Sequence, residues 1–292
     1  MRPPLVLTVA GSDAAGAAGV QADLKTFTAL GVYGASAITL VTSVAGHGPR
    51  GTHPLPPDVV RTQIDEVVRD LHVDVLKIGA LGTAAIVQTV ADAVRTHRDR
   101  FGPIVLDPVM IASDGAPLIS AEGADALRSE LVPLATVLTP NLAEAAQLLG
   151  RPQATTIEEM REQALALQAL GPQAVVMSGG LLPAEDDAVD VVVHPGGTDL
   201  LRAEREAGRH VAGAGATYSA AIAAQLARIA DFDRAGELEE IGEEGEDDDL
   251  ATIIATAREF VASATAHAAD WEITRSAQVR RPLNHLITLD KS

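Results

Sequence analysis

A glycine-rich turn runs directly into an apolar helical pattern in the last third of the chain. The turn is Gly213-Ala214-Gly215-Ala216, and the sequence "TYSAAIAAQLARIA" follows it. Backbone N–H groups at such a turn and at a helix N-terminus stabilise negative charge, such as that on a transferred phosphoryl group. An enzyme that uses the turn in this way normally has a proton acceptor at its end, and Ala216 cannot accept a proton. Close packing of the helix against a strand is the alternative explanation for the glycines.

Three oxygen-bearing side chains follow apolar, β-branched runs. Asp107 closes the run "PIVL" and precedes Pro108, and Asn141 and Glu144 lie three residues apart in "TPNLAEA". On the first turn of a helix, residues three apart share a face. Carboxylate and amide oxygens there can hold Mg²⁺, which retains several water ligands. A turn aspartate at position 107 and an ordinary helix start at Asn141 remain open as alternatives.

Six short apolar runs alternate with helical patterns along the chain. We expect strands within residues 5–11, 35–44, 73–81, 103–110, 135–141 and 173–180. We expect helices over residues 20–30, 57–71, 83–97, 122–131 and 157–170. Buried strands that alternate with helices predict an α/β fold with a mostly parallel sheet covered on both faces.

The carboxyl ends of these strands carry polar or glycine residues. The ends are Gly11-Ser12-Asp13, Gly79, Asp107, Thr139-Pro140-Asn141 and Ser178-Gly179-Gly180. Ligands bind at the carboxyl ends of strands in such sheets. We therefore expect these five ends to line one crevice.

Composition excludes several classes of partner. The chain of 292 residues carries a formal net charge of −18 and only 2% aromatic residues, so neither nucleic acid nor an anionic membrane is expected as a partner. It has no cysteine, which excludes disulfides and thiolate zinc sites and fits a reducing cytoplasm. No apolar stretch approaches the roughly 20 residues that span a bilayer. We expect a cytoplasmic protein.

Familiar catalytic motifs are missing from the sequence. The segment "GSDAAGAAGVQADLKTF" matches neither the P-loop pattern nor the dinucleotide fingerprint. The chain also lacks H-E-x-x-H and G-x-S-x-G, which argues against zinc and serine hydrolases. Asp23 and Lys25, on the helix that follows, face either the site or solvent, and for Lys25 we favour solvent.

An acidic segment stands apart from the rest of the chain. Residues 231–249 hold 11 acidic residues and one arginine, a net charge of −10. Like charges at this density repel one another, so we expect a solvated, flexible loop. A cation site or a partner site is the alternative, although the EF-hand spacing is absent.

Several strings, in order, resemble one family closely. They are "TVAGSDAAGAAGVQADLKTFTALGVYGASAITLVT", "KIGAL", "VLDPVM", "LVPLATVLTPNLAEAAQLLG", "SGG", "GAGATYSAAIAAQLA" and "RPLNHL". The pattern is similar to that of hydroxymethylpyrimidine/phosphomethylpyrimidine kinases of the ribokinase-like superfamily. It covers most of the chain outside the acidic segment, and its joint occurrence is highly specific. Pyridoxal kinases share much of it.

The resemblance implies a fold, an activity and a cofactor set. It implies one three-layer α/β/α domain over residues 1–292, with the acidic segment as an insert, and a homodimer. It implies ATP, Mg²⁺ and the sequential phosphorylation of the 4-amino-5-hydroxymethyl-2-methylpyrimidine precursor of thiamine.

The resemblance also assigns roles to individual residues. Asp107 and Glu144 are the expected metal ligands. The expected anion hole is Gly213, Ala214, Gly215 and Ala216. The expected nucleotide and phosphate residues are Asn141, Ser178, Gly179, Gly180 and Thr217. The expected pyrimidine pocket contains Gly11, Asp23, Val44, Ala80 and Val109.

Departures from the family pattern affect the base, the substrate pocket and the nucleotide site together. Ala216 replaces the cysteine or aspartate that ends the turn in the family. Val44 replaces a glutamine, Ala80 replaces a methionine, and Ser178 and Leu181 replace the lysine and histidine of a K-G-G-H string. The early "GSDSGGGAG" string is "GSDAAGAAG" here.

These losses predict a slow kinase or one of altered specificity. Loss of a general base costs about 10²–10⁴-fold in rate, and phosphoryl transfer relies mainly on positioning and electrostatics. A non-catalytic ligand-binding protein of the same fold and a pyridoxal-type vitamer kinase are the two alternatives.

Overall fold

The computed structural model describes most of the chain. The described residues are 2–43, 51–112, 115, 117–180, 182, 187–203, 211–235, 246–268, 271, 273 and 281–287. No described helix is long and apolar enough to cross a membrane.

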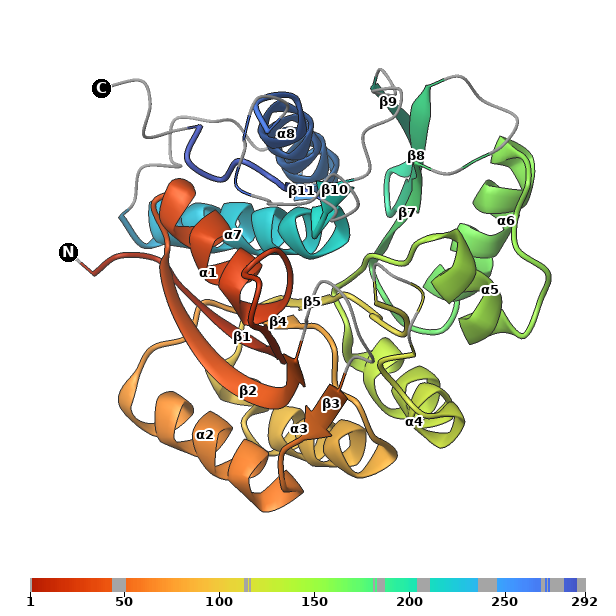
Figure 1. The fold of residues 1–292 in the computed structure, drawn as a ribbon. Coiled ribbons are helices and arrows are strands. Elements are labelled where there is room, and N and C mark those ends of the chain that lie inside the picture. The colour runs from red at the N-terminus through yellow and green to blue at the C-terminus, as the bar shows by residue number, and fades with distance from the viewer. Residues whose placement is uncertain are drawn as a thin grey trace.

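A nine-stranded sheet forms the centre of the molecule, with the strand order β3-β2-β1-β4-β5-β6-β7-β8-β9 (Figure 1). Its strands are β1 (Leu5–Asp13), β2 (Tyr33–Ser43), β3 (Gly51–Pro54), β4 (Val75–Ile78), β5 (Ile104–Leu106), β6 (Val137–Leu138), β7 (Ala174–Gly179), β8 (Ala188–His194) and β9 (Gly197–Ala203). Neighbours from β2 to β7 pair in parallel, whereas β3, β8 and β9 pair antiparallel at the two edges. The predicted mostly parallel sheet is thus confirmed.

Helices cover both faces of this sheet, which makes three layers. The helices are α1 (Gly19–Ala29), α2 (Pro57–Asp70), α3 (Ala84–Thr96), α4 (Ala121–Ala126), α5 (Leu142–Leu149), α6 (Ile157–Gln168), α7 (Ala214–Ala235) and α8 (Glu246–Ala266). Shorter elements are a π turn (Leu127–Leu131), 3₁₀ turns (Arg98–Arg100 and Val132–Leu134), and the paired strands β10 (Val211–Ala212) and β11 (Arg281–Pro282). Helices α1, α7 and α8 lie on one face, and α2 to α6 lie on the other (Figure 1).

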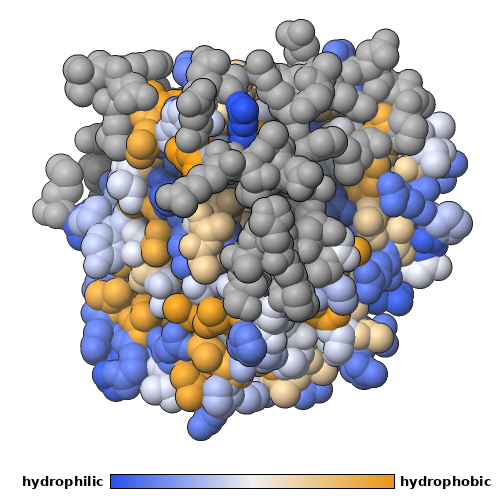
Figure 2. Space-filling model, viewed as in Figure 1, coloured by the Kyte–Doolittle hydropathy of each residue, from blue (hydrophilic) through white to orange (hydrophobic). Residues whose placement is uncertain are grey.

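The layers follow from two periodicities in the sequence. Along β1, Leu5, Leu7 and Val9 pack into the core under α2 to α6, whereas Val6 packs into the core under α7 and α8. Along α2, Val60, Ile64 and Val68 recur every four residues and are buried. Figure 2 shows hydrophilic residues over the outer side of α2, at the lower left.

The antiparallel hairpin β8–β9 was not among the expected strands. Its two strands are joined by the two residues between His194 and Gly197, and Gly197 has a φ of 146°. A two-residue turn flanked by alternating apolar residues is the local signal for such a hairpin.

The acidic segment differs from the expected loop at both ends. Helix α7 continues through Ala235, and α8 begins at Glu246, so the two ends of residues 231–249 are helical. The apolar patterns on either side extend the helices into the charged region. Residues 236–245 lie outside the described part of the chain.

Candidate active site

Backbone hydrogen bonds hold the carboxyl ends of the central strands side by side. The N–H of Gly79 donates to Val9 O, that of Asp107 to Ile78 O, and that of Thr139 to Leu106 O, at 2.9–3.0 Å. The N–H of Ser178 donates to Pro140 O at 3.0 Å, and Asn141 forms a parallel bridge with Ser178. The residues predicted from strand ends are therefore neighbours where the carboxyl ends of the central strands meet.

The glycine turn lies at the N-terminus of α7. The first helical hydrogen bond runs from Thr217 N to Gly213 O at 2.8 Å. The N–H groups of Ala214, Gly215 and Ala216 therefore precede it and have no intrahelical acceptor. Three N–H groups with no acceptor among the described residues, at the positive end of a 22-residue helix, form a site for an anion.

Gly213 is required by both its conformation and its surroundings. Its φ is +87°, and a Cβ at this position would lie 1.7 Å from the carbonyl oxygen of Ala17. Ala17 belongs to the loop after β1, where the Asp13 carboxylate accepts the N–H groups of Ala15, Ala17 and Ala18 at 2.9–3.1 Å. The anion turn and the early loop are thus in direct backbone contact.

A buried lysine, which the sequence interpretation did not single out, occupies the sheet next to the turn. Lys77 on β4 is 1% exposed, and its Nζ lies 3.0 Å from both carboxylate oxygens of Asp23 on α1. Thr8 donates to Asp23 Oδ2 at 2.6 Å. The sequence feature that could have pointed to Lys77 is a lysine inside the apolar strand "VLKI", because a buried ammonium group requires a partner.

Asp107 joins this network from β5. Its Oδ2 lies 4.0 Å from Lys77 Nζ and accepts a hydrogen bond from Ser219 Oγ at 3.0 Å. Burial raises the pKa of Asp107, while the Lys77 ammonium and the Ser219 hydroxyl oppose that rise. Ser219 Oγ is also 3.0 Å from the Ala216 carbonyl oxygen, so one hydroxyl connects the carboxylate to the anion turn.

Asn141 and Glu144 form a capping box at the start of α5. Asn141 Oδ1 accepts the N–H of Glu144 at 2.9 Å, and Glu144 Oε2 accepts the N–H of Asn141 at 3.0 Å. The helix-start interpretation of this pair is thus confirmed. Burial, together with the charge of Asp107, raises the pKa of Glu144 to about 8. A cation beside Asp107 and Glu144 would stabilise the charged form of the buried Glu144 and would reduce its repulsion by Asp107.

The residues predicted for the substrate pocket lie at the ends of adjacent strands. Gly11 lies two residues before the end of β1, Ala80 follows β4 and Val109 follows β5. The carbonyl oxygen of Ala80 accepts the Thr39 hydroxyl at 2.6 Å. Asp23 is fully buried below them, with both oxygens bonded to protein groups. Val44 lies outside the described residues.

The predicted nucleotide residues follow β7. The N–H of Gly179 donates to Asp190 Oδ1 at 3.2 Å, and Arg258 Nε on α8 lies 2.5 Å from Asp190 Oδ2. Neither Asp190 nor Arg258 was predicted, because they lie on β8 and α8, far from the strand ends in sequence. Gly180 is exposed, whereas Leu181 lies outside the described residues.

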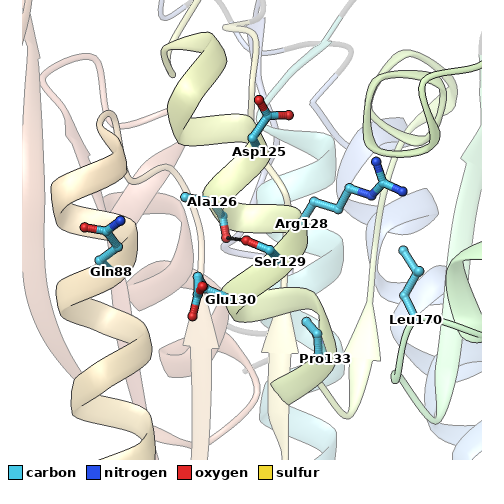
Figure 3. Close-up of a pocket in the computed structure, with 8 residues that line it drawn as sticks. All are labelled: Gln88, Asp125, Ala126, Arg128, Ser129, Glu130, Pro133 and Leu170. Carbon is cyan, nitrogen blue, oxygen red and sulfur yellow. Dashed lines mark hydrogen bonds between the residues drawn. The ribbon is translucent and has the colours of Figure 1, made fainter.

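An open hollow of about 580 Å³ lies in the helix layer, over α3, α4 and the π turn. Figure 3 shows Gln88 on α3 at one side of it, and Arg128 and Leu170 at the other. Pro133 and Leu170 also line it, and they precede β6 and β7 rather than follow them. The hollow is therefore separate from the strand-end site.

A three-layer α/β/α arrangement with an open helix N-terminus and buried carboxylates at the strand ends defines a ribokinase-like α/β protein. The chain belongs to the phosphomethylpyrimidine kinase family, whose family model matches residues 13–237. It is 43% identical over 218 residues to the hydroxymethylpyrimidine/phosphomethylpyrimidine kinase of Escherichia coli, covering 75% of this chain and 81% of the relative.

Solved structures of related kinases share the fold. An ADP complex of Bacillus subtilis pyridoxal kinase matches with a TM-score of 0.83 and 34% identity over the full length of both chains. Staphylococcus aureus pyridoxal kinase in complex with AMP-PCP and pyridoxal matches with a TM-score of 0.81 and 29% identity, covering 98% of this chain and 94% of the other.

Removing the Lys77 ammonium should destabilise the fold strongly. Lys77→Met leaves the buried Asp23 carboxylate without its counter-ion, and breaking a buried pair from one side costs about 3–5 kcal/mol. The double variant Asp23→Asn/Lys77→Met removes both charges and should recover part of that loss. Urea denaturation of the three proteins measures the free energy of unfolding.

The matched control for this pair is Arg61→Met on α2. Arg61 Nε lies 2.8 Å from Asp65 Oδ1 in a partly exposed pair, so its loss should cost about 1 kcal/mol or less. A Lys77→Met loss as small as that of the control contradicts the assigned role of the buried pair.

The raised pKa of Glu144 predicts a stability that falls as pH rises. The unfolded chain releases this proton near pH 4.5 and the folded protein near pH 8, so the folded state binds more protons in between. The stabilisation is complete below pH 4.5 and is lost as pH rises through 8, on the order of 5 kcal/mol in all. Glu144→Gln should remove this slope in urea denaturation between pH 5 and 9.

Glu159→Gln provides the comparison for that experiment. Glu159 is the corresponding residue of α6, and hydrogen bonds from the backbone and hydroxyl of Thr155 lower its pKa. It is charged in both states across the same pH range, so its variant should keep the wild-type slope. Equal slopes for wild type and Glu144→Gln would contradict the prediction.

Proposed function

We propose that this chain transfers the γ-phosphoryl group of ATP to the hydroxyl group of hydroxymethylpyrimidine and then to its monophosphate. The single observation that carries the proposal is the Ser219 hydroxyl, which donates to Asp107 and lies 3.0 Å from the carbonyl oxygen of Ala216. It brings a carboxylate and the three free N–H groups of α7 to one point at the strand ends. Together with the family assignment, this supports phosphoryl transfer rather than simple anion binding.

The residues present fit a magnesium ion held jointly by protein and phosphate. Among the described residues no three acidic, histidine or cysteine side chains form a metal-binding group, so a cage made only of protein is not supported. Mg²⁺ usually takes one or two carboxylates and completes its shell with water and phosphate oxygens. Asp107 and Glu144 would supply the carboxylates, and the ion would neutralise charge that develops on the phosphates.

The nucleotide would lie on the β7 side of the site. Asn141, Ser178, Gly179 and Gly180 are the residues proposed to contact it. Thr217, expected from the sequence to be a nucleotide residue, is fully buried at the start of α7 with its hydroxyl bonded to His285, so it would act indirectly. Gly11, Ala80 and Val109, with Val44, would line the alcohol pocket. Asp23 would act indirectly, by holding Lys77 beneath that pocket.

Ala216 makes this a slow enzyme in the proposal. The α7 N–H groups stabilise the phosphoryl group, but no side chain at the turn takes the hydroxyl proton, which then passes to water. A missing base costs about 10²–10⁴-fold and leaves the remaining acceleration in place. The expected homodimer and cytoplasmic setting belong to this proposal as well.

A pyridoxal-type activity is the second candidate. The observation in its favour is the match to two pyridoxal kinase structures over almost the whole of this chain. Both substrates are hydroxymethyl-substituted aromatic nitrogen heterocycles, so one site geometry can serve either.

Turnover of single substrates tests the proposal. Purified protein is incubated with Mg-ATP and hydroxymethylpyrimidine, its monophosphate or pyridoxal, and the products are identified by mass. We expect slow formation of phosphorylated pyrimidine. Phosphorylated pyridoxal alone would favour the second candidate, and nucleotide binding with no product would favour a non-catalytic binding protein.

Restoring a base should accelerate the reaction. Ala216→Cys or Ala216→Asp places a proton acceptor at the end of the turn and should raise kcat by about 10²–10⁴-fold with little change in the KM for ATP. Ala214→Cys introduces the same side chain two residues earlier and should give no gain. If neither residue-216 variant is faster than wild type, the missing base is not what limits turnover.

A further inference from the structure

A short segment at residues 281–287, here called the strap, holds the start of α7. Its strand β11 pairs with β10, which leads directly into Gly213 (Figure 1). Leu283, Asn284 and His285 of the strap are buried, and the N–H of Asn284 donates to Ala264 O near the end of α8 at 3.0 Å. The strap therefore joins the end of one helix to the anion turn of the other.

Thr217 in α7 lacks a hydroxyl contact that several other helical threonines of this chain make. Five of them donate their hydroxyl to the carbonyl oxygen four residues earlier, at 2.7–2.9 Å: Thr26, Thr28, Thr62, Thr96 and Thr265. Thr217 does not. Its buried Oγ1 lies 2.9 Å from Nε2 of the buried His285, and among the described residues Gly213 O accepts the N–H of Thr217 and not its hydroxyl.

The protonation state of His285 fixes the direction of this hydrogen bond. Burial, together with the charge of Lys25, lowers the pKa of His285 to about 4, so the ring is neutral at pH 7. Among the described residues, Nε2 is the hydrogen-bond partner that the structure gives the Thr217 hydroxyl. We therefore assign the ring proton to Nδ1, which leaves the lone pair on Nε2 to accept the hydroxyl proton.

Without this acceptor, the hydroxyl would turn to the carbonyl of Gly213. It would then compete with the first helical hydrogen bond of α7, and such back-bonding bends helices. The bend would fall on the residue with the +87° φ and would redirect the N–H groups of Ala214, Gly215 and Ala216.

We propose that His285 is a positioning residue for phosphoryl transfer, because it holds the Thr217 hydroxyl away from the anion turn. The proposal rests on the proposed function of that turn. With Ala216 in place of a base, these N–H groups and the metal site proposed at Asp107 and Glu144 are the catalytic elements left, so the orientation of the N–H groups matters for the rate.

Four variants test the proposal. His285→Leu removes the acceptor and should lower kcat about tenfold to a hundredfold, somewhat less than the about 10²–10³ of a lost anion-hole donor, with little change in KM for the alcohol. His285→Gln keeps an acceptor near the position of Nε2 and should retain most of the activity. Thr217→Val/His285→Leu removes the misdirected hydroxyl as well and should regain kcat relative to His285→Leu. Asn284→Ala weakens the strap elsewhere and should lower the melting temperature without lowering kcat.

A readout that needs no turnover separates this inference from the proposed function. In protein labelled with ¹⁵N-glycine, the amide resonances of Gly213 and Gly215 are followed while inorganic phosphate is added. We expect His285→Leu to shift both resonances and weaken the phosphate response, whereas His285→Gln and Asn284→Ala leave them as in wild type. This pattern in a protein without turnover would support the positioning role while the proposed function fails.

The opposite results overturn the inference. If His285→Leu keeps the wild-type kcat and glycine resonances, His285 does not position the turn. The same conclusion follows if Asn284→Ala lowers kcat as much as His285→Leu does, because the strap then acts only through stability. It follows also if the double variant is no faster than His285→Leu alone.

Discussion

The buried ammonium group of Lys77 is the constraint on which the site depends. A charge with 1% exposure needs carboxylates close by, and it has Asp23 from α1 and Asp107 from β5. These partners fix α1 and β5 relative to β4. Through Ser219, the same network reaches α7 and therefore the turn that presents the free N–H groups. The electrostatic requirement of one lysine thus determines where an anion can be bound.

Around this network, the site depends on backbone geometry more than on side-chain chemistry. The anion turn offers N–H groups, Gly213 is the residue type that its contact with Ala17 permits, and Asp13 shapes the facing loop by accepting three N–H groups. Alanine at positions 214 and 216 leaves all of these features in place. This explains how a chain that lacks the side-chain base can still keep the architecture of a phosphoryl-transfer site.

Much of the fold and part of the site could be predicted from the sequence, because local patterns carry them. Apolar runs identified the parallel strands, and strand ends identified Asp107 and the residues from 178 to 180. Lys77 and its partner Asp23 lie 54 residues apart, and Thr217 and His285 lie 68 apart, so no local spacing connects them. The capping box at Asn141 shows a different limit of prediction from sequence. Its local motif was recognisable, but the same residues form a helix start and a candidate site, and the motif does not distinguish the two.

The contact between Gly213 and Ala17 has a consequence for how the protein is made. The loop after β1 emerges early during synthesis, whereas α7 and the strap that supports it emerge late. The site is complete only when the two segments have packed against each other. We therefore expect a growing chain that has formed only its central parallel strands to lack the anion site, and to gain phosphate binding once the strap has been made and has folded.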